Sequence, residues 1–169
     1  MNAVPSPSEE PAPSDAPPPP SRGILDTSTV ILLARLTDAA KLPDEPLITT
    51  VTLAELSVGP LLARDHDERA ARQAHLQQAE TDFDPLPFDA AAARAFGRVA
   101  ASLHRAGRKT EARAYDAMIA ATAVANDLPV YTCNAANFSG IDDLEVVAVP
   151  SPEHPTPPET ESLDTPPAR

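Results

Sequence analysis

Several residue types that mark other classes of protein are scarce in this chain of 169 residues. It has no tryptophan, two tyrosines and four phenylalanines, which are too few for a platform on which nucleic-acid bases stack. The single cysteine, Cys133, permits no intramolecular disulfide and fits a reducing compartment. The four histidines lack the spacing of zinc ligands.

Membrane-spanning and secretory segments are also missing from the sequence. No apolar run approaches the length that crosses a bilayer. The N-terminus is proline-rich and acidic, without the basic start and apolar run of a signal peptide. We therefore expect a cytoplasmic protein with no membrane partner.

Proline, by contrast, is abundant and gathers at both ends of the chain. Of 21 prolines, eight lie in residues 1–22 and six in residues 151–169. Such segments favour extended, solvated backbone and lack the apolar side chains that offset the entropy of ordering. We predict a disordered Pro-rich tail over residues 1–22, one folded domain over residues 23–150, and a disordered, acidic Pro-rich tail over residues 151–169.

The formal net charge of −12 argues mildly against non-specific binding of nucleic acid. It does not exclude a nuclease, because carboxylates that hold divalent cations present a neutralised surface. Only a specific site can outweigh the charge.

Apolar patterning and turn residues predict an alternation of strands and helices. We expect strands at residues 23–26, 47–51, 83–88, 128–132 and 146–149. We expect helices at residues 28–37, 52–64, 67–80, 89–105 and 111–126. This alternation indicates an α/β fold in which helices cover both faces of a central parallel sheet, a three-layer α/β/α sandwich.

Three acids fall where such a fold collects ligands, outside the carboxyl ends of the strands. Asp26 closes the first strand, Glu55 lies in the first turn of the next helix, and Asp116 begins an apolar helix. Asp26 could instead be only a helix cap, and Glu55 only the partner of Thr52 in a capping box. Asp116 is harder to explain as a purely structural residue, because a buried, unpaired carboxylate is costly.

Three neighbouring carboxylates repel one another, and a divalent cation removes that penalty. At about 4–5 Å and an effective dielectric near 20, each pair costs roughly 4 kcal/mol. Hard oxygen ligands select Mg²⁺ or Mn²⁺ rather than zinc. The residues themselves therefore predict a metal site of Asp26, Glu55 and Asp116.

Four segments closely resemble the motifs of the VapC toxins. They are Ile24-Leu25-Asp26-Thr27-Ser28, Thr52-Leu53-Ala54-Glu55-Leu56, Tyr115-Asp116-Ala117-Met118-Ile119-Ala120-Ala121, and Tyr131-Thr132-Cys133-Asn134 with Asn137-Phe138. Their order and spacing match over residues 23–149. The resemblance implies a PIN-type fold and a Mg²⁺- or Mn²⁺-dependent endoribonuclease, the toxin of a type II toxin–antitoxin pair. It also implies an RNA substrate, inhibition by a VapB-like antitoxin and, we expect, a homodimer.

The resemblance also assigns residues around the acids. Asn137 stands where the family usually has an acid, so it would be a metal ligand without charge and would weaken a second metal position. Thr132 and Asn134 would bind substrate or orient the acids, although Asn134 could equally be an ordinary turn residue.

Basic residues gather just before Asp116. Arg108, Lys109 and Arg113 are expected to contact RNA phosphates near the metal. Arg94 and Arg98 are expected to belong to a solvated helix face.

Two rival functions remain. A haloacid-dehalogenase-type phosphatase needs a second aspartate two positions after Asp26, where this chain has Ser28. The second rival is a catalytically weakened PIN-fold module that binds RNA or protein, and Asn137 is the best argument for it. Metal titration separates such a module from the enzyme.

Overall fold

The computed structural model describes residues 22–36, 39–110 and 113–151, so almost all of both predicted tails lies outside the described residues. Four short strands form a parallel sheet in the order β2-β1-β3-β4. They are β1 (Arg22–Leu25), β2 (Glu45–Leu47), β3 (Val130–Thr132) and β4 (Val146–Ala148). The predicted parallel α/β architecture is confirmed.

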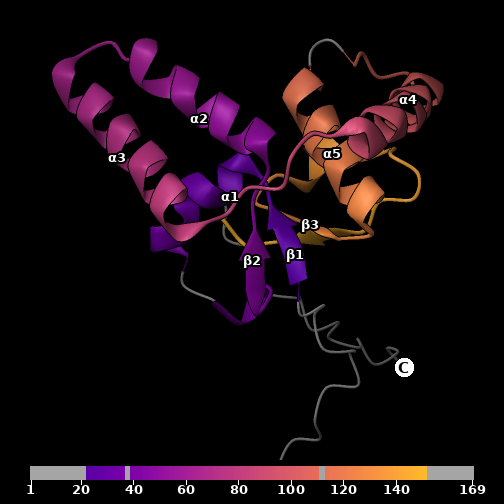
Figure 1. Ribbon diagram of the computed structural model, residues 1–169, viewed down its shortest axis with the longest axis horizontal. Coiled ribbons are helices and arrows are strands. Elements are labelled where there is room, and N and C mark those ends of the chain that lie inside the picture. The colour runs from indigo at the N-terminus through magenta and orange to yellow at the C-terminus, as the bar shows by residue number, and fades with distance from the viewer. Residues whose placement is uncertain (1–21, 37–38, 111–112, 152–169) are drawn as a thin grey trace, which may run out of the picture.

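The described α-helices are α1 (Thr27–Leu32), α2 (Thr50–Leu61), α3 (His66–Asp82), α4 (Ala90–Arg105) and α5 (Ala114–Asn126). Short 3-10 turns are η1 (Leu33–Arg35), η2 (Ala39–Lys41) and η4 (Ala135–Phe138). Helices α1 to α3 lie on one side of the sheet and α4 and α5 on the other (Figure 1). None of the helices in the described part is long and apolar enough to span a bilayer.

Two hydrophobic cores hold these layers together, one on each face of the sheet. Ile24 and Val130 pack with apolar residues of α4 and α5. Their neighbours in the strands, Leu25 and Tyr131, pack on the opposite face with residues of α1, α2 and α3. Because side chains alternate between the two faces of a strand, each strand contributes to both cores.

The predicted strand at residues 47–51 and the capping box after it are wrong. The strand ends at Leu47, and Thr49 caps α2 by accepting a hydrogen bond from the backbone nitrogen of Thr52 at 3.1 Å. Thr52 therefore lies inside the helix, and Glu55 falls in the second turn rather than the first. The sequence offers threonines at both positions, and the first of them is the cap.

The predicted strand at residues 83–88 is also wrong. It is reduced to one isolated bridge between Thr49 and Leu86, because Pro85 and Pro87 lack the N–H groups that a ladder needs. The helix expected over residues 28–37 stops at Leu32 and continues as η1.

Candidate functional site

The site lies where the order of the strands reverses. Strand β1 has β2 on one side and β3 on the other, so the carboxyl ends of β1 and β3 flank the switch point of the sheet. Asp26 follows β1, and Thr132 ends β3 and donates a hydrogen bond to Asp26 Oδ2 at 2.8 Å. This hydrogen bond joins the two strand ends at the place where open α/β sheets bind their ligands.

Asp26 is buried and held by several donors. Its carboxylate accepts hydrogen bonds from Ser28 Oγ at 2.8 Å and from the backbone nitrogen of Thr29 at 2.9 Å, besides the one from Thr132. The bond from Thr29 makes Asp26 the N-cap of α1, as one interpretation of the sequence expected. The cap does not compete with a role in the site, because it fixes the direction of the carboxylate.

Glu55 reaches the same region from α2. Thr27 Oγ1 donates a hydrogen bond to Glu55 Oε2 at 2.6 Å. Thr27 is the residue after Asp26, so this bond ties the β1–α1 turn to α2. Since Glu55 does not cap its helix, its side chain has no structural task at the helix end.

Asp116 is half-buried near the start of α5, and its carboxyl group is strongly perturbed. Burial, followed by the negative charges of Glu55 and Asp26, raises its pKa from 3.8 to about 6, against the opposing effect of Arg113. No residue in the described ranges donates a hydrogen bond to this carboxylate. The charges of Asp26 and Glu55 therefore act on Asp116, and the raised pKa of Asp116 is the result.

The donor set fits a hard divalent cation, because all three side chains offer carboxylate oxygens. Within the described ranges, no three His, Cys, Asp or Glu side chains lie close enough together in their present positions to hold a metal ion. An ion here would complete its coordination with water, as Mg²⁺ commonly does in proteins.

Asn137 lies beside this region, in η4. Its Oδ1 accepts a hydrogen bond from Arg113 Nη1 at 2.8 Å. The amide oxygen that the resemblance assigned to metal is thus engaged by a guanidinium group, whose charge also reaches Asp116. Asn137 and Arg113 form a positively charged border to the acids.

The other predicted contact residues have distinct environments. The hydroxyl of Thr132 is committed to Asp26, so it orients that acid. Asn134 is exposed; its backbone nitrogen donates to Thr132 Oγ1 at 2.9 Å and its carbonyl accepts from the nitrogen of Asn137 at 3.0 Å, so its backbone leads from β3 into η4. Its side chain makes no hydrogen bond within the described part of the chain.

Arg108 and Lys109, the basic residues in the loop before α5, differ in whether they have a partner among the described residues. Arg108 Nη1 donates to the carbonyl of Ser139 at 2.6 Å, which holds its guanidinium group in place. Lys109 is exposed and makes no ion pair with any residue that the structure describes. Both side chains, with His104 and Thr110, line an open hollow of about 570 Å³.

Sequence reasoning left the hydroxyls of Thr27 and Ser28 unassigned, although both hydrogen-bond to predicted site acids. Each fixes one carboxylate, Glu55 and Asp26 respectively. Their signal was the run of three hydroxyl residues directly after the strand-ending acid.

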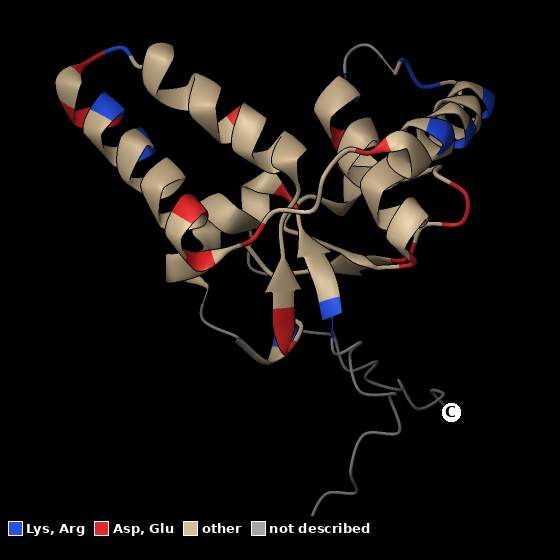
Figure 2. Ribbon diagram, viewed as in Figure 1, with Lys and Arg blue, Asp and Glu red and all other residues tan. Residues whose placement is uncertain are grey.

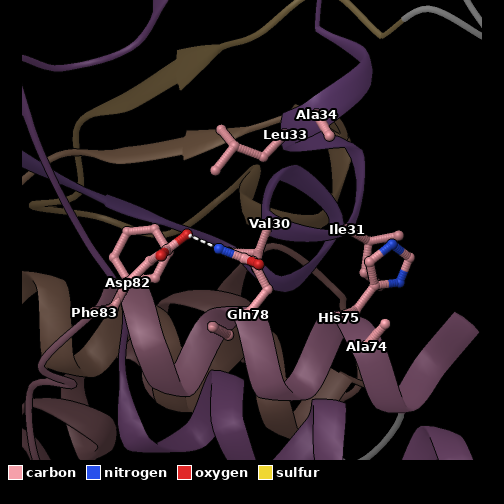
Figure 3. A pocket seen from close by; sticks show the side chains of 10 residues that line it. Val30, Ile31, Leu33, Ala34, Ala74, His75, Gln78, Asp82 and Phe83 are labelled. Atoms are coloured by element: carbon pink, nitrogen blue, oxygen red, sulfur yellow. Dashed lines mark hydrogen bonds between the residues drawn. The ribbon is translucent and has the colours of Figure 1, made fainter.

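A groove leads away from Glu55 between α1 and α3. Its first part, about 370 Å³, is lined by Thr27, Glu55, Ile31 and His75 among others. The second part, about 420 Å³, continues past Ile31 and His75 to Phe83 (Figure 3). The groove is mainly apolar beyond the acid.

The comparisons with known proteins agree with this geometry. Residues 24–144 match the family model described as PIN domain. Ribonuclease VapC5 of Mycobacterium tuberculosis (strain ATCC 25618 / H37Rv) is 40% identical over 134 residues, which cover 77% of this chain and 97% of that protein. Ribonuclease VapC of Rickettsia bellii (strain RML369-C) is 30% identical over 130 residues, 75% of this chain and 96% of that protein.

Solved structures give the same result. The crystal structure of VapBC-5 from Mycobacterium tuberculosis, a member of the VapBC family of toxin–antitoxin systems, matches with a TM-score of 0.67 and 42% identity over 77% of this chain and 100% of that chain. DNA-bound VapBC from Salmonella typhimurium matches with a TM-score of 0.61 and 25% identity over 74% and 96%. The chain belongs to the PIN-domain family and, within it, to the VapC ribonucleases.

Proposed function

We propose that this chain is the toxin of a type II toxin–antitoxin system, an endoribonuclease that hydrolyses RNA phosphodiester bonds with Mg²⁺ or Mn²⁺. The observation that carries the proposal is the electrostatic coupling of Asp26, Glu55 and Asp116 at the switch point of a VapC-family fold. The alternative, a non-catalytic module, is less well supported, because it gives no reason to keep the costly charge of Asp116.

The three carboxylates would hold the ion, which supplies Lewis acidity toward the phosphate and lowers the pKa of bound water. The chain's own residues prepare this chemistry. Ser28 and Thr132 orient Asp26. Asp116 must lose its proton before it binds an ion, so acidification through about pH 6 weakens the site.

Basic residues next to the site would position the RNA backbone. Helix α4 contains no acid; arginines lie along it, and Arg108 and Lys109 lie in the loop after it (Figure 2). The hollow at Arg108 and Lys109 offers hydrogen-bond donors to a phosphate, and Arg113 lies between that hollow and Asp116 in the sequence. Phosphate contacts of this kind fix the register of a strand without reading its bases.

The apolar groove between α1 and α3 is the surface that we assign to a VapB-like antitoxin. Glu55 and Ile31 line the same part of the groove, so an antitoxin segment that covers Ile31 would also lie over Glu55. The structural relatives are VapBC complexes, which supports a partner of this kind. A homodimer remains an expectation.

Cleavage mapping on whole-cell RNA tests the proposed function. The purified chain should cut RNA at defined positions with Mg²⁺ or Mn²⁺, and should cut nothing after chelation of divalent ions. Cleavage that persists in a chelator would contradict the proposed metal chemistry. A complete lack of specific cleavage with both ions would favour the binding module.

A further inference from the structure

Five of the six aromatic side chains are part of the protein interior. Tyr131 and Phe138 are almost completely buried. The remaining phenylalanines, Phe83, Phe88 and Phe96, are partly buried and pack against the two cores. Their positions are explained by the folding of the chain.

Tyr115 is the exception. Its side chain is 44% exposed and belongs to neither core. Its hydroxyl makes no hydrogen bond with any residue in the described ranges. A large aromatic ring that is this exposed and lies outside both cores adds less to stability than a buried one, so the packing of the fold does not by itself account for its presence.

The position of Tyr115 places it at the border of the acidic site. It is the second residue of α5 and directly precedes Asp116. The Cα atoms of consecutive residues are only about 3.8 Å apart, so the side chain of Tyr115 begins close to that of Asp116, although the two point in directions about 100° apart around the helix. Its neighbour Ala114 is exposed and small, which leaves the ring accessible.

We propose that the ring of Tyr115 is a stacking surface for one nucleobase of the RNA, next to the phosphodiester that is cleaved. The inference rests on the proposed ribonuclease function and adds a base contact to it. Every base has a π-face, so stacking on a single ring tolerates any sequence and fixes the position of the strand instead. This ring adds a contact at the site itself to the phosphate contacts of the basic segment.

Two variants separate the ring from the rest of the side chain. Tyr115→Ala removes the ring and favours the helix, so it should fold. Tyr115→Phe keeps the ring and removes only a hydroxyl without a described partner. On an RNA oligonucleotide that the wild type cleaves, Tyr115→Ala should raise KM about 5- to 150-fold, and Tyr115→Phe should stay near the wild type.

An abasic scan of the same oligonucleotide then locates the stacked base. In the wild type, one abasic position beside the cleaved bond should raise KM by a similar factor. In Tyr115→Ala that position should have little further effect, because the two changes remove the same contact. The kcat should change less than KM in both cases.

Three results would count against the inference in different ways. Equal sensitivity of the wild type and Tyr115→Ala at every abasic position overturns it, while the proposed ribonuclease function stands. A variant that cleaves normally but resists a VapB-like antitoxin also overturns it and assigns the ring to the partner surface. No cleavage by the wild type overturns the proposed function itself.

Discussion

The carboxyl group of Asp116 shows how the site sets the charge of a single residue. In an unfolded chain its pKa is near 3.8, whereas burial and the charges of Glu55 and Asp26 raise it to about 6 in the fold. Between these values the folded protein keeps a proton that the unfolded chain has lost. This group therefore makes the free energy of unfolding fall as the pH rises from about 4 to about 6, and the penalty is complete above that range.

Asp116→Asn should remove the penalty in metal-free protein. We expect the free energy of unfolding to rise by about 1 kcal/mol at about pH 7.5, after a discount for solvent screening, and to change little at about pH 3.5. Urea denaturation in the presence of a chelator measures both. Asp84→Asn, which changes an exposed loop acid, is the control and should show no such pH dependence. An equal effect of Asp116→Asn at both pH values would contradict the raised pKa.

Substitutions at Asn137 and Arg113 show whether the charge next to the acids sets the Mg²⁺ concentration that cleavage needs. Asn137→Asp would pair with Arg113 and offset the positive charge that now acts on Asp116. The Mg²⁺ concentration at half-maximal cleavage should fall about three- to tenfold, equivalent to about 1 kcal/mol. Arg113→Gln should shift the curve in the same direction if the effect passes through that charge. Superimposable curves for Asn137→Asp and the wild type would show that position 137 does not influence the ion.

The sequence singled out Asp26 and Asp116 because each stands at the end of a strand or the start of a helix, and it singled out Glu55 from a predicted helix start that lies one turn earlier in the structure. It could not predict the bond between Arg113 and Asn137, which are 24 residues apart and meet only when η4 packs against α5. Nor could it show that Tyr131 is fully buried while Tyr115 is exposed. Those facts depend on which side of each element faces the sheet.

At the scale of elements, strand β1 depends on a close approach between its backbone and a ring. A Cβ atom on Gly23 would overlap the ring of Tyr131, whereas a Cβ on Gly97 in α4 would meet nothing within 4 Å. Strand β1 is paired on both sides, so its backbone has little freedom to move away. The same substitution by alanine therefore creates a clash at Gly23 and none at Gly97, so the second serves as the control for the first.

Gly23→Ala should lower the free energy of unfolding by about 1–3 kcal/mol through overpacking. Gly97→Ala should raise it by about 0.5–1 kcal/mol, because alanine favours the interior of a helix. Chemical denaturation of both variants measures the difference. A Gly23→Ala protein as stable as the wild type would mean that Tyr131 can move and that its packing on β1 is loose.

The elements that the sequence predicted correctly have strong periodic patterns, and those that it missed depend on competition between neighbours. Helices α3 and α4 were predicted to within two residues at each end. The start of α2 was missed because Thr49 and Thr52 both satisfy the local rule for a cap. The strand at residues 83–88 was missed because its prolines cannot donate to a sheet, despite the apolar pattern between them.

At the scale of the whole molecule, the family match begins and ends within the part of the chain that the structure describes. The PIN match covers residues 24–144, and 77% of this chain accounts for 97% of VapC5. Most of both Pro-rich ends therefore lies outside the PIN match.

A chain of residues 22–150 should fold and cleave RNA at a rate close to that of the full chain, because every predicted site residue lies inside it. Circular dichroism and cleavage of one RNA substrate compare the two forms. An insoluble or inactive short form would show that an end segment contributes to the domain or the site.

The most direct test of the account is the RNA cleavage rate as a function of Mg²⁺ concentration for Asp26→Asn, Glu55→Gln and Asp116→Asn, with Asp84→Asn as control. The substitutions keep side-chain size, and asparagine can still cap α1. We predict that each of the three reduces cleavage to background at every Mg²⁺ concentration, while Asp84→Asn follows the wild-type curve. Wild-type cleavage by any one of the three at limiting Mg²⁺ would contradict a single metal site built from these acids.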